Sequence, residues 1–154
     1  MRLVFDTSAL LNMVRFLGSD AVDYLRGGYI LTLTPYEVGN ALWKEAALLG
    51  RISVEEALSL LDYVASVYKL LSITAPRDAL LTLKLAYELN VTYYDASYIV
   101  ASHELNVGLV TDDEKLKRKI HEKRGVLTRV LGKSVTVYST RELIESYGQP
   151  GSTC

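Results

Sequence analysis

The chain opens with the stretch Leu3-Val4-Phe5-Asp6-Thr7-Ser8-Ala9-Leu10, which joins a short apolar run to an acid and two hydroxyl side chains. Residues 3–5 predict a short buried strand, and residues 8–17 have the apolar spacing of a helix. A second stretch, Leu109-Val110-Thr111-Asp112-Asp113, likewise places acids between a predicted strand and a charged helix. A strand that ends on an acid and leads into a helix is therefore the unit on which the fold prediction rests.

Strands and helices alternate along the rest of the chain. The pattern predicts strands at 29–33, 70–74, 108–111 and 135–138, and helices at 20–26, 34–49, 53–69, 79–89, 95–105 and 113–123, with a final helix after Ser139. Capping boxes are expected where Thr34 meets Glu37 and where Ser53 meets Glu56. This alternation predicts an α/β fold with a central, mostly parallel β-sheet of about four to five strands and helices on both faces.

Length and composition indicate one domain. The 154 residues are 49 % hydrophobic and 23 % charged, so extensive disorder is excluded. We expect a single domain over residues 1–147 and a disordered tail over 148–154, which has the composition of a linker. The single cysteine, Cys154, excludes an internal disulfide and fits a reducing cytoplasm, and no apolar run is long enough for a membrane span. A net charge of −1 argues against a broadly basic nucleic-acid binder.

Acidic side chains recur where helices begin. Asp6 follows the first strand, Glu37 lies in the first turn of the helix after the second strand, and the pair Asp112-Asp113 follows a later strand. Asp95 is expected at a similar strand-to-helix transition. Each acid alone has a structural interpretation, because Asp caps helices and Glu completes capping boxes. The carboxyl ends of parallel strands share one edge of a sheet, so these acids are expected to converge there.

Converging carboxylates need a compensating charge. Helix dipoles offset part of their repulsion, and a divalent cation would offset the rest. Oxygen ligands and water suit Mg²⁺ or Mn²⁺, whereas the absence of Cys and His from these motifs argues against Zn²⁺. Such a site binds a phosphodiester, activates a water and stabilises the leaving oxygen, so hydrolysis of a nucleic-acid backbone is the predicted chemistry.

Four segments occur in an order and spacing typical of one known family. They are Leu3-Val4-Phe5-Asp6-Thr7-Ser8-Ala9-Leu10, Tyr36-Glu37-Val38-Gly39-Asn40-Ala41-Leu42, Tyr94-Asp95-Ala96-Ser97-Tyr98-Ile99-Val100-Ala101 and Leu109-Val110-Thr111-Asp112-Asp113-Glu114-Lys115-Leu116. Through these segments the chain resembles the PIN-domain ribonucleases over about residues 1–140, in particular the toxin half of VapBC-type toxin–antitoxin pairs. The resemblance implies a nuclease with a central parallel sheet, an Mg²⁺ or Mn²⁺ site and single-stranded RNA as substrate.

The resemblance also assigns the catalytic and metal-binding roles. Asp6, Glu37 and Asp95 match the three usual acids of the family. The fourth acid usually lies two residues after the threonine, which favours Asp113 and leaves Asp112 as a helix cap, although the pattern does not exclude Asp112. By the resemblance, the three aspartates would hold the metal directly or through water. Glu37 would hold or orient a second metal, or position the attacking water.

Polar neighbours of these acids are candidate supporting residues. Ser8 and Thr111 match hydroxyl positions that support the acids or a metal-bound water, and helix capping is their alternative role. Asn40 lies about one turn after Glu37 and therefore shares its helix face. It would either hydrogen-bond into the site or lie at the surface as a polar residue.

A basic stretch follows the last acidic motif. Residues 115–133 hold one acid, Glu122, and the cations Lys115, Lys117, Arg118, Lys119, Lys123, Arg124, Arg129 and Lys133. The first four of these cations are candidate contacts for the RNA backbone. The alternative is a solvated helix face, which is the usual role of a charge run.

Apolar segments outside the motifs indicate protein contacts. Segments 10–17 and 57–65 are too apolar for fully exposed helices, so we expect them in the core. The resemblance adds a groove for a helical segment of a cognate antitoxin, and a homodimer interface. Trp43 is expected in the core or at an interface, and His103 and His121 are expected at the surface.

Three functions compete at this stage. The leading hypothesis is an endoribonuclease toxin in the cytoplasm that a cognate antitoxin inhibits. The first alternative is a PIN nuclease of RNA processing or maturation. The second is a non-catalytic scaffold that binds protein or RNA, and the presence of all four acids argues against it.

Overall fold

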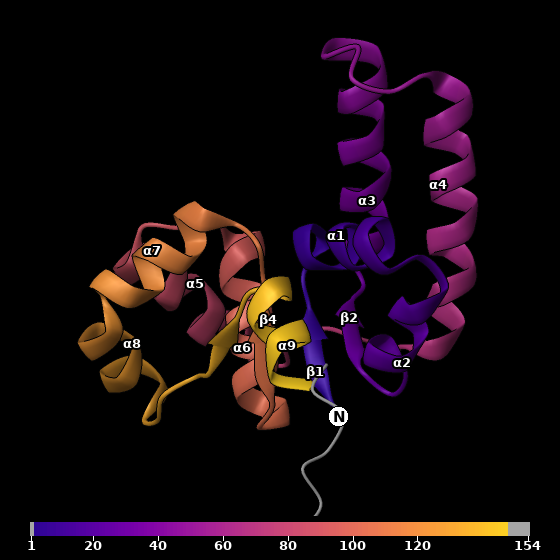
Figure 1. Cartoon of the computed structure of the whole chain (residues 1–154). Helices are drawn as coiled ribbons and strands as arrows, with labels where there is room; N and C mark the ends of the chain where they lie inside the picture. Colours follow the sequence, from indigo (N-terminus) through magenta and orange to yellow (C-terminus); the bar gives the residue numbers. More distant parts are fainter. Residues whose placement is uncertain (1, 148–154) are drawn as a thin grey trace, which may run out of the picture.

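The structure is a computed structural model that describes residues 2–147 (Figure 1). The predicted tail, residues 148–154, lies outside the described residues. In chain order the elements are β1 (Leu3–Phe5), α1 (Thr7–Leu17), η1 (Gly18–Asp20), α2 (Ala21–Leu25), β2 (Tyr29–Leu31), α3 (Thr34–Trp43), η2 (Lys44–Leu48), α4 (Val54–Val67), η3 (Tyr68–Leu70), β3 (Ser72–Thr74), α5 (Ala79–Leu89), α6 (Tyr93–Leu105), β4 (Gly108–Val110), α7 (Glu114–Glu122), α8 (Arg124–Leu131), β5 (Val137–Tyr138) and α9 (Thr140–Tyr147).

The five strands form one sheet in the order β3-β2-β1-β4-β5, and all neighbouring strands are parallel. This confirms the predicted α/β fold. The chain adds strands outward from β1 to β3 and then returns to place β4 on the other side of β1, where Val4 pairs with Leu109. The strand order therefore reverses between β1 and β4, which is where open α/β sheets bind their ligands.

Helices cover both faces of the sheet, as the sequence predicts (Figure 1). Successive side chains of a strand point to opposite faces, so Leu3 and Phe5 enter one core and Val4 enters the other. Side chains of α1, α2, α3, α4 and α9 fill the first core. Side chains of α5, α6, α7 and α8 fill the second. These two apolar layers fix the carboxyl ends of β1 and β4 next to each other.

Helices α3 and α4 lie side by side and project beyond the sheet (Figure 1). The π-helical turn η2 continues α3, and Gly50, with φ at +57°, allows the chain to reverse toward α4. The predicted capping box opens α4: Ser53 Oγ accepts from Glu56 N at 3.0 Å, and Ser53 N donates to Glu56 Oε2 at 2.7 Å. Within residues 2–147, none of the helices combines the length and the apolar character needed to cross a membrane.

One predicted transition is wrong, and one helix was not predicted. Among the described residues no strand lies between α5 and α6, and α6 begins at Tyr93, with Thr92 as its N-cap. Asp95 therefore lies inside the first turn of α6 rather than at a strand-to-helix transition. The helix predicted over 113–123 is confirmed as α7, whereas α8, from Arg124 to Leu131, was not predicted.

The predicted capping box between Thr34 and Glu37 is also wrong. Thr34 lies inside α3, is fully buried, and its Oγ1 accepts a hydrogen bond from Leu31 N at 3.0 Å. The Glu37 carboxylate instead accepts hydrogen bonds from Thr7 and Tyr98. Tertiary partners thus replace the local cap, and Glu37 is directed away from its own helix end.

Candidate active site

A cavity of about 570 Å³ lies at the carboxyl edge of the sheet, lined by residues of α1, α3, η2 and the start of α6 and by Asp113, which precedes α7. The four acids that the sequence singles out, Asp6, Glu37, Asp95 and Asp113, all line it. They come from four segments that are far apart in the sequence. The topology of the sheet brings their carboxylates to one place, as the convergence argument predicts.

Asp6 is buried and held at the start of α1. Its Oδ1 accepts hydrogen bonds from Ser8 Oγ at 2.7 Å and from Ala9 N at 2.8 Å, so Asp6 is also the N-cap of α1. Burial is the main cause that raises the pKa of Asp6 to about 6; the charge of Asp112 adds to it, and hydrogen bonds from Thr111, Ala9 and Ser8 oppose it. A cation in the cavity would relieve the cost of this buried charge.

Glu37 is oriented by hydroxyl groups from two other helices. Its Oε1 accepts from Tyr98 OH at 2.7 Å and from Thr7 Oγ1 at 3.0 Å. The Tyr98 hydroxyl also lies 2.8 Å from Thr34 Oγ1, so this phenol connects α6 to α3. Burial raises the pKa of Tyr98, which keeps the hydroxyl protonated as a donor. In the described part of the chain no hydrogen bond is made to Glu37 Oε2, so this oxygen is available to a water or a cation.

Asp95 and Asp113 are close enough for their charges to interact. Burial raises the pKa of Asp95, and the charge of Asp113 raises it further. Asp113 is the N-cap of α7, because its Oδ1 accepts from Lys115 N at 2.8 Å and from Leu116 N at 3.0 Å. Its Oδ2 makes no hydrogen bond to residues 2–147. A helix cap and a cavity-facing oxygen are therefore combined in one side chain.

Asp112 is not the helix cap that the sequence predicts, since Asp113 occupies that position. Asp112 Oδ2 accepts from Asn12 Nδ2 at 2.8 Å, and Oδ1 accepts from Thr140 N at 2.8 Å. The carboxylate thus connects α1 to the start of α9. Asp112 is not among the residues that line the acid cavity.

The three predicted supporting residues lie beside the acids. Ser8 Oγ donates to Asp6 and accepts from Asp112 N at 2.9 Å, so it joins the segments that follow β1 and β4. Thr111 is fully buried, and its Oγ1 accepts from Asp113 N at 3.1 Å. Asn40 lines the cavity on the same face of α3 as Glu37.

Sequence reasoning missed Tyr98 and three cations, Arg15, Lys44 and Arg51, that line the same cavity. Arg15 is paired with Glu45 at 2.8 Å. Helical spacing was the available signal for two of them, because Tyr98 follows Asp95 by three residues and Lys44 follows Glu37 by seven. Arg15 and Arg51 had no such signal, since the tertiary fold alone brings them to the acids.

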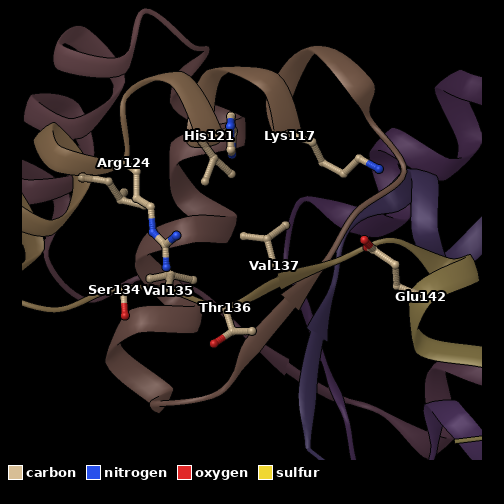
Figure 2. A pocket seen from close by; sticks show the side chains of 10 residues that line it. Lys117, His121, Arg124, Ser134, Val135, Thr136, Val137 and Glu142 are labelled. Atoms are coloured by element: carbon tan, nitrogen blue, oxygen red, sulfur yellow. The ribbon is translucent and has the colours of Figure 1, made fainter. Parts of the chain in front are cut away.

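The four predicted RNA contacts lie on α7, the helix that follows Asp113. Figure 2 shows a different cavity, of about 400 Å³, bordered by Lys117, His121 and Arg124. Lys117 is paired with Glu114 at 2.8 Å and interacts with the charge of Glu142. None of the four candidate contacts lines the acid cavity, and their contact with RNA stays a prediction: Lys115, Lys117, Arg118 and Lys119.

The remaining predictions concern residues outside the site. Trp43 is 54 % exposed, so its placement in the core is wrong and an interface stays a prediction. His121 is exposed as expected, whereas His103 is half-buried. The two apolar segments pack mainly in the first core, but Phe16 and Leu58 are exposed.

The donor groups of the acid cavity fit a hydrated divalent cation. All four acids offer hard oxygen ligands, and Glu37 and Asp113 each direct one oxygen to protein donors while the other stays unbonded within residues 2–147. Among these residues, no three Asp, Glu, His or Cys side chains are grouped so that they could hold an ion directly. Mg²⁺ commonly uses one or two carboxylates and several waters, so the cavity suits an ion bound partly through water.

The chain is an α/β domain whose carboxylates gather where the strand order of the parallel sheet reverses, between β1 and β4. The PIN domain family matches residues 3–121, and the chain belongs to this family. Two curated relatives narrow the likeness to VapC-type PIN domains.

The relatives and a solved structure come from Pyrobaculum aerophilum. Exonuclease VapC9 is 44 % identical over 90 residues, a match that spans 58 % of this chain and 65 % of the relative's own length. Ribonuclease VapC3 is 30 % identical over 125 residues, which cover 77 % of this chain and 95 % of the relative. The crystal structure of PAE2754 is similar with a TM-score of 0.65 and 26 % identity, covering 86 % of this chain and 97 % of that one.

Proposed function

We propose that the protein is a divalent-metal-dependent endoribonuclease that acts as the toxin of a type II toxin–antitoxin system. The observation that carries the proposal is the convergence of Asp6, Glu37, Asp95 and Asp113 on one cavity at the switch point of the sheet. The names of VapC3, a ribonuclease, and VapC9, an exonuclease, support hydrolysis of a nucleic-acid backbone.

Mg²⁺ or Mn²⁺ is the proposed cofactor. Asp6, Asp95 and Asp113 would hold it directly or through water. Glu37, whose Oε1 is fixed by Tyr98, would use Oε2 to orient the attacking water. A bound divalent cation supplies the positive charge that activates a water and stabilises the leaving oxygen.

The hydroxyl groups of the chain keep the carboxylates in position. Ser8 holds Asp6 and the backbone of Asp112 together, so the segments after β1 and β4 present their acids with fixed spacing. Thr7, from the segment after β1, and Tyr98, from α6, hold Glu37 through hydrogen bonds to Oε1. A preorganised set of groups avoids rearrangement during the reaction, which is where electrostatic catalysis gains most.

The test compares a linear RNA with the same sequence closed into a circle, each with Mg²⁺, with Mn²⁺ or with EDTA. An endonuclease cuts both RNAs, whereas an exonuclease leaves the circle intact because it has no ends. We expect cleavage of both with metal and of neither with EDTA, and Asp95→Asn should remove the activity while the circular dichroism spectrum is unchanged. Cleavage of the linear RNA alone would assign an exonuclease, and cleavage of neither by the wild type would overturn the proposal.

A cognate antitoxin and a second copy of the chain are the proposed protein partners, in the cytoplasm. Exposed apolar side chains on α1, η2 and α4 support a docking surface for the antitoxin; among them are Phe16, Leu48 and Leu58. Co-expression with a neighbouring small gene should yield a complex whose RNA cleavage is suppressed. Release of activity on separating the two proteins would then identify the partner as an inhibitor.

A further inference from the structure

One stripe along α3 and η2 runs from Glu37 to Lys44, beside which Arg51 also lines the cavity. Glu37, Asn40, Ala41, Lys44 and Glu45 all line the acid cavity. Their spacing of three and four residues places them on one helical face. Seven residues separate Glu37 from Lys44, which corresponds to roughly 10 Å along a helix axis at a rise of 1.5 Å per residue.

The wide turn at the end of α3 brings a second cation to the same cavity. Leu49 N donates to Lys44 O at 3.0 Å in η2, and Arg51 N donates to Glu45 O at 2.9 Å. Gly50 between them adopts φ of +57°, and both Leu49 and Arg51 line the cavity. Such π-helical turns often occur at functional sites. Here the turn places Leu49 and Arg51 along the cavity that the acids line.

The charges along this stripe are not equally compensated. Glu45 is paired with Arg15 at 2.8 Å, so these two charges neutralise each other. Lys44 and Arg51 are exposed and, in the described part of the chain, neither forms an ion pair. The cavity therefore has the four carboxylates at one end and two uncompensated cations at the other.

We propose that Lys44 and Arg51 bind a phosphate of the RNA strand next to the scissile phosphodiester. This inference rests on the proposed function and adds the direction of the strand, which leaves the acids along α3 toward η2. Both cations reach the strand from the projecting hairpin rather than from the basic stretch on α7. They bind substrate without taking part in bond cleavage, so their loss raises KM and leaves kcat unchanged.

The main experiment uses the full chain with the double variant Lys44→Ala/Arg51→Ala and a matched control, Arg26→Ala/Lys69→Ala. The control removes the same two residue types, both exposed, just before β2 and just before β3, at the amino ends of the strands. On a single-stranded oligonucleotide, the first variant should raise KM about tenfold or more, since hydrogen bonds to charged groups are worth that much. The control should keep the wild-type KM, and both variants should keep the wild-type kcat.

A second measurement records RNA affinity against salt concentration in an Asp95→Asn background, with Mn²⁺ present. Each neutralised phosphate contributes roughly 0.7 to the slope for single strands, so Lys44→Ala/Arg51→Ala, which frees one phosphate, should lower the slope by about 0.7. Lys44→Arg/Arg51→Lys keeps both charges and should restore most of the wild-type slope. A dinucleotide substrate lacks the neighbouring phosphate and should be cleaved equally by variant and wild type.

The outcomes separate this inference from the proposed function. If Lys44→Ala/Arg51→Ala matches the control in KM and in salt slope, the inference is overturned while wild-type cleavage still supports the nuclease. If the wild type cleaves no RNA, the proposed function fails, and the salt slope in the Asp95→Asn background still decides whether these cations bind RNA.

Discussion

The acid cavity and the basic cavity beside α7 and α8 are built in opposite ways. The first collects side chains from α1, α3, α6 and α7 that are distant in the sequence. The basic side chains of the second, Lys117, His121 and Arg124, come from one continuous stretch, although residues 134–137 and Glu142 also line it (Figure 2). A charge run is visible in a sequence, whereas convergent charges become visible only when the strand order is known. The most conspicuous cations of this chain are therefore not those nearest the candidate chemistry.

The adjacent aspartates give the sharpest test of which groups belong to the acid cavity. Asp113→Asn should lower kcat for RNA cleavage by about 10²- to 10³-fold, because a cavity carboxylate that stabilises developing charge is lost. Asp113 also caps α7, and Asn is an equally good cap, so the melting temperature should change little.

Asp112→Asn is the matched control for this change. Asp112 does not itself line the cavity, although its partner Asn12 does, so kcat should stay within about threefold of wild type. The amide cannot keep both charge-assisted hydrogen bonds, and we expect a loss of about 1–2 kcal/mol in stability. An inactive Asp112→Asn beside an active Asp113→Asn would exchange the two assignments.

Asp6, which lines only the acid cavity, should make the stability of the metal-free protein depend on pH. Burial raises its pKa from 3.8 to about 6, which corresponds to a cost of about 3 kcal/mol when the carboxylate is ionised in the folded, metal-free protein. The folded state therefore binds the proton more tightly than the unfolded state. This cost is complete above pH 6 and disappears as the pH falls from 6 toward 4.

Asp6→Asn should accordingly raise the melting temperature in EDTA at pH 8 by roughly 6–12 °C as an upper limit, and by little at pH 4. Calorimetry at the two pH values measures this difference. Mn²⁺ should stabilise the wild type and leave the variant unchanged. A lower melting temperature for Asp6→Asn at pH 8 would contradict the buried, ionised carboxylate.

Tyr98 tests how strongly the acid cavity depends on the core. Tyr98→Phe removes the 2.7 Å hydrogen bond to Glu37 and leaves the buried Thr34 hydroxyl without this partner. We expect a loss of about 1–2 kcal/mol in stability and roughly a tenfold drop in kcat, because Glu37 is no longer fixed. Urea unfolding and single-turnover cleavage report the two effects. Tyr138→Phe, at a phenol that does not line the acid cavity, is the control and should keep kcat.

Much of the fold and the acid set followed from the sequence because both depend on local patterns. Apolar runs with following acids predicted β1 and β4, and helical spacing predicted α5 with its bounds. The convergence of Asp6 and Asp113 then followed from the rule that carboxyl ends of parallel strands share an edge.

Contacts between distant elements could not be predicted in this way. Thr34 and Glu37 have the spacing of a capping box, but Leu31 N and the Tyr98 hydroxyl compete for these side chains once α6 is packed. The choice between Asp112 and Asp113 depended on Thr140, 28 residues away. Tertiary partners decide such cases, and a single sequence does not contain them.

The smallest predicted effect comes from the basic stretch itself. Lys115→Ala/Arg118→Ala removes one exposed lysine and one exposed arginine from α7, the same charge change as Lys44→Ala/Arg51→Ala. Neither α7 residue lines the acid cavity, so we expect only a two- to fivefold loss of RNA affinity, the scale of roughly 0.5–1 kcal/mol for exposed charge contacts.

The RNA affinities of the two double variants should be measured side by side at one salt concentration. The ratio of their losses compares the contributions of the two regions to RNA binding. A larger loss for the α7 variant than for the α3 variant would assign the main RNA path to the basic stretch. We expect a smaller loss of RNA affinity for the α7 variant. When exposed cations on a solvated helix face are removed, the RNA can contact other cations on the surface instead. The cations at the cavity mouth instead meet the strand where the acids have already fixed its position.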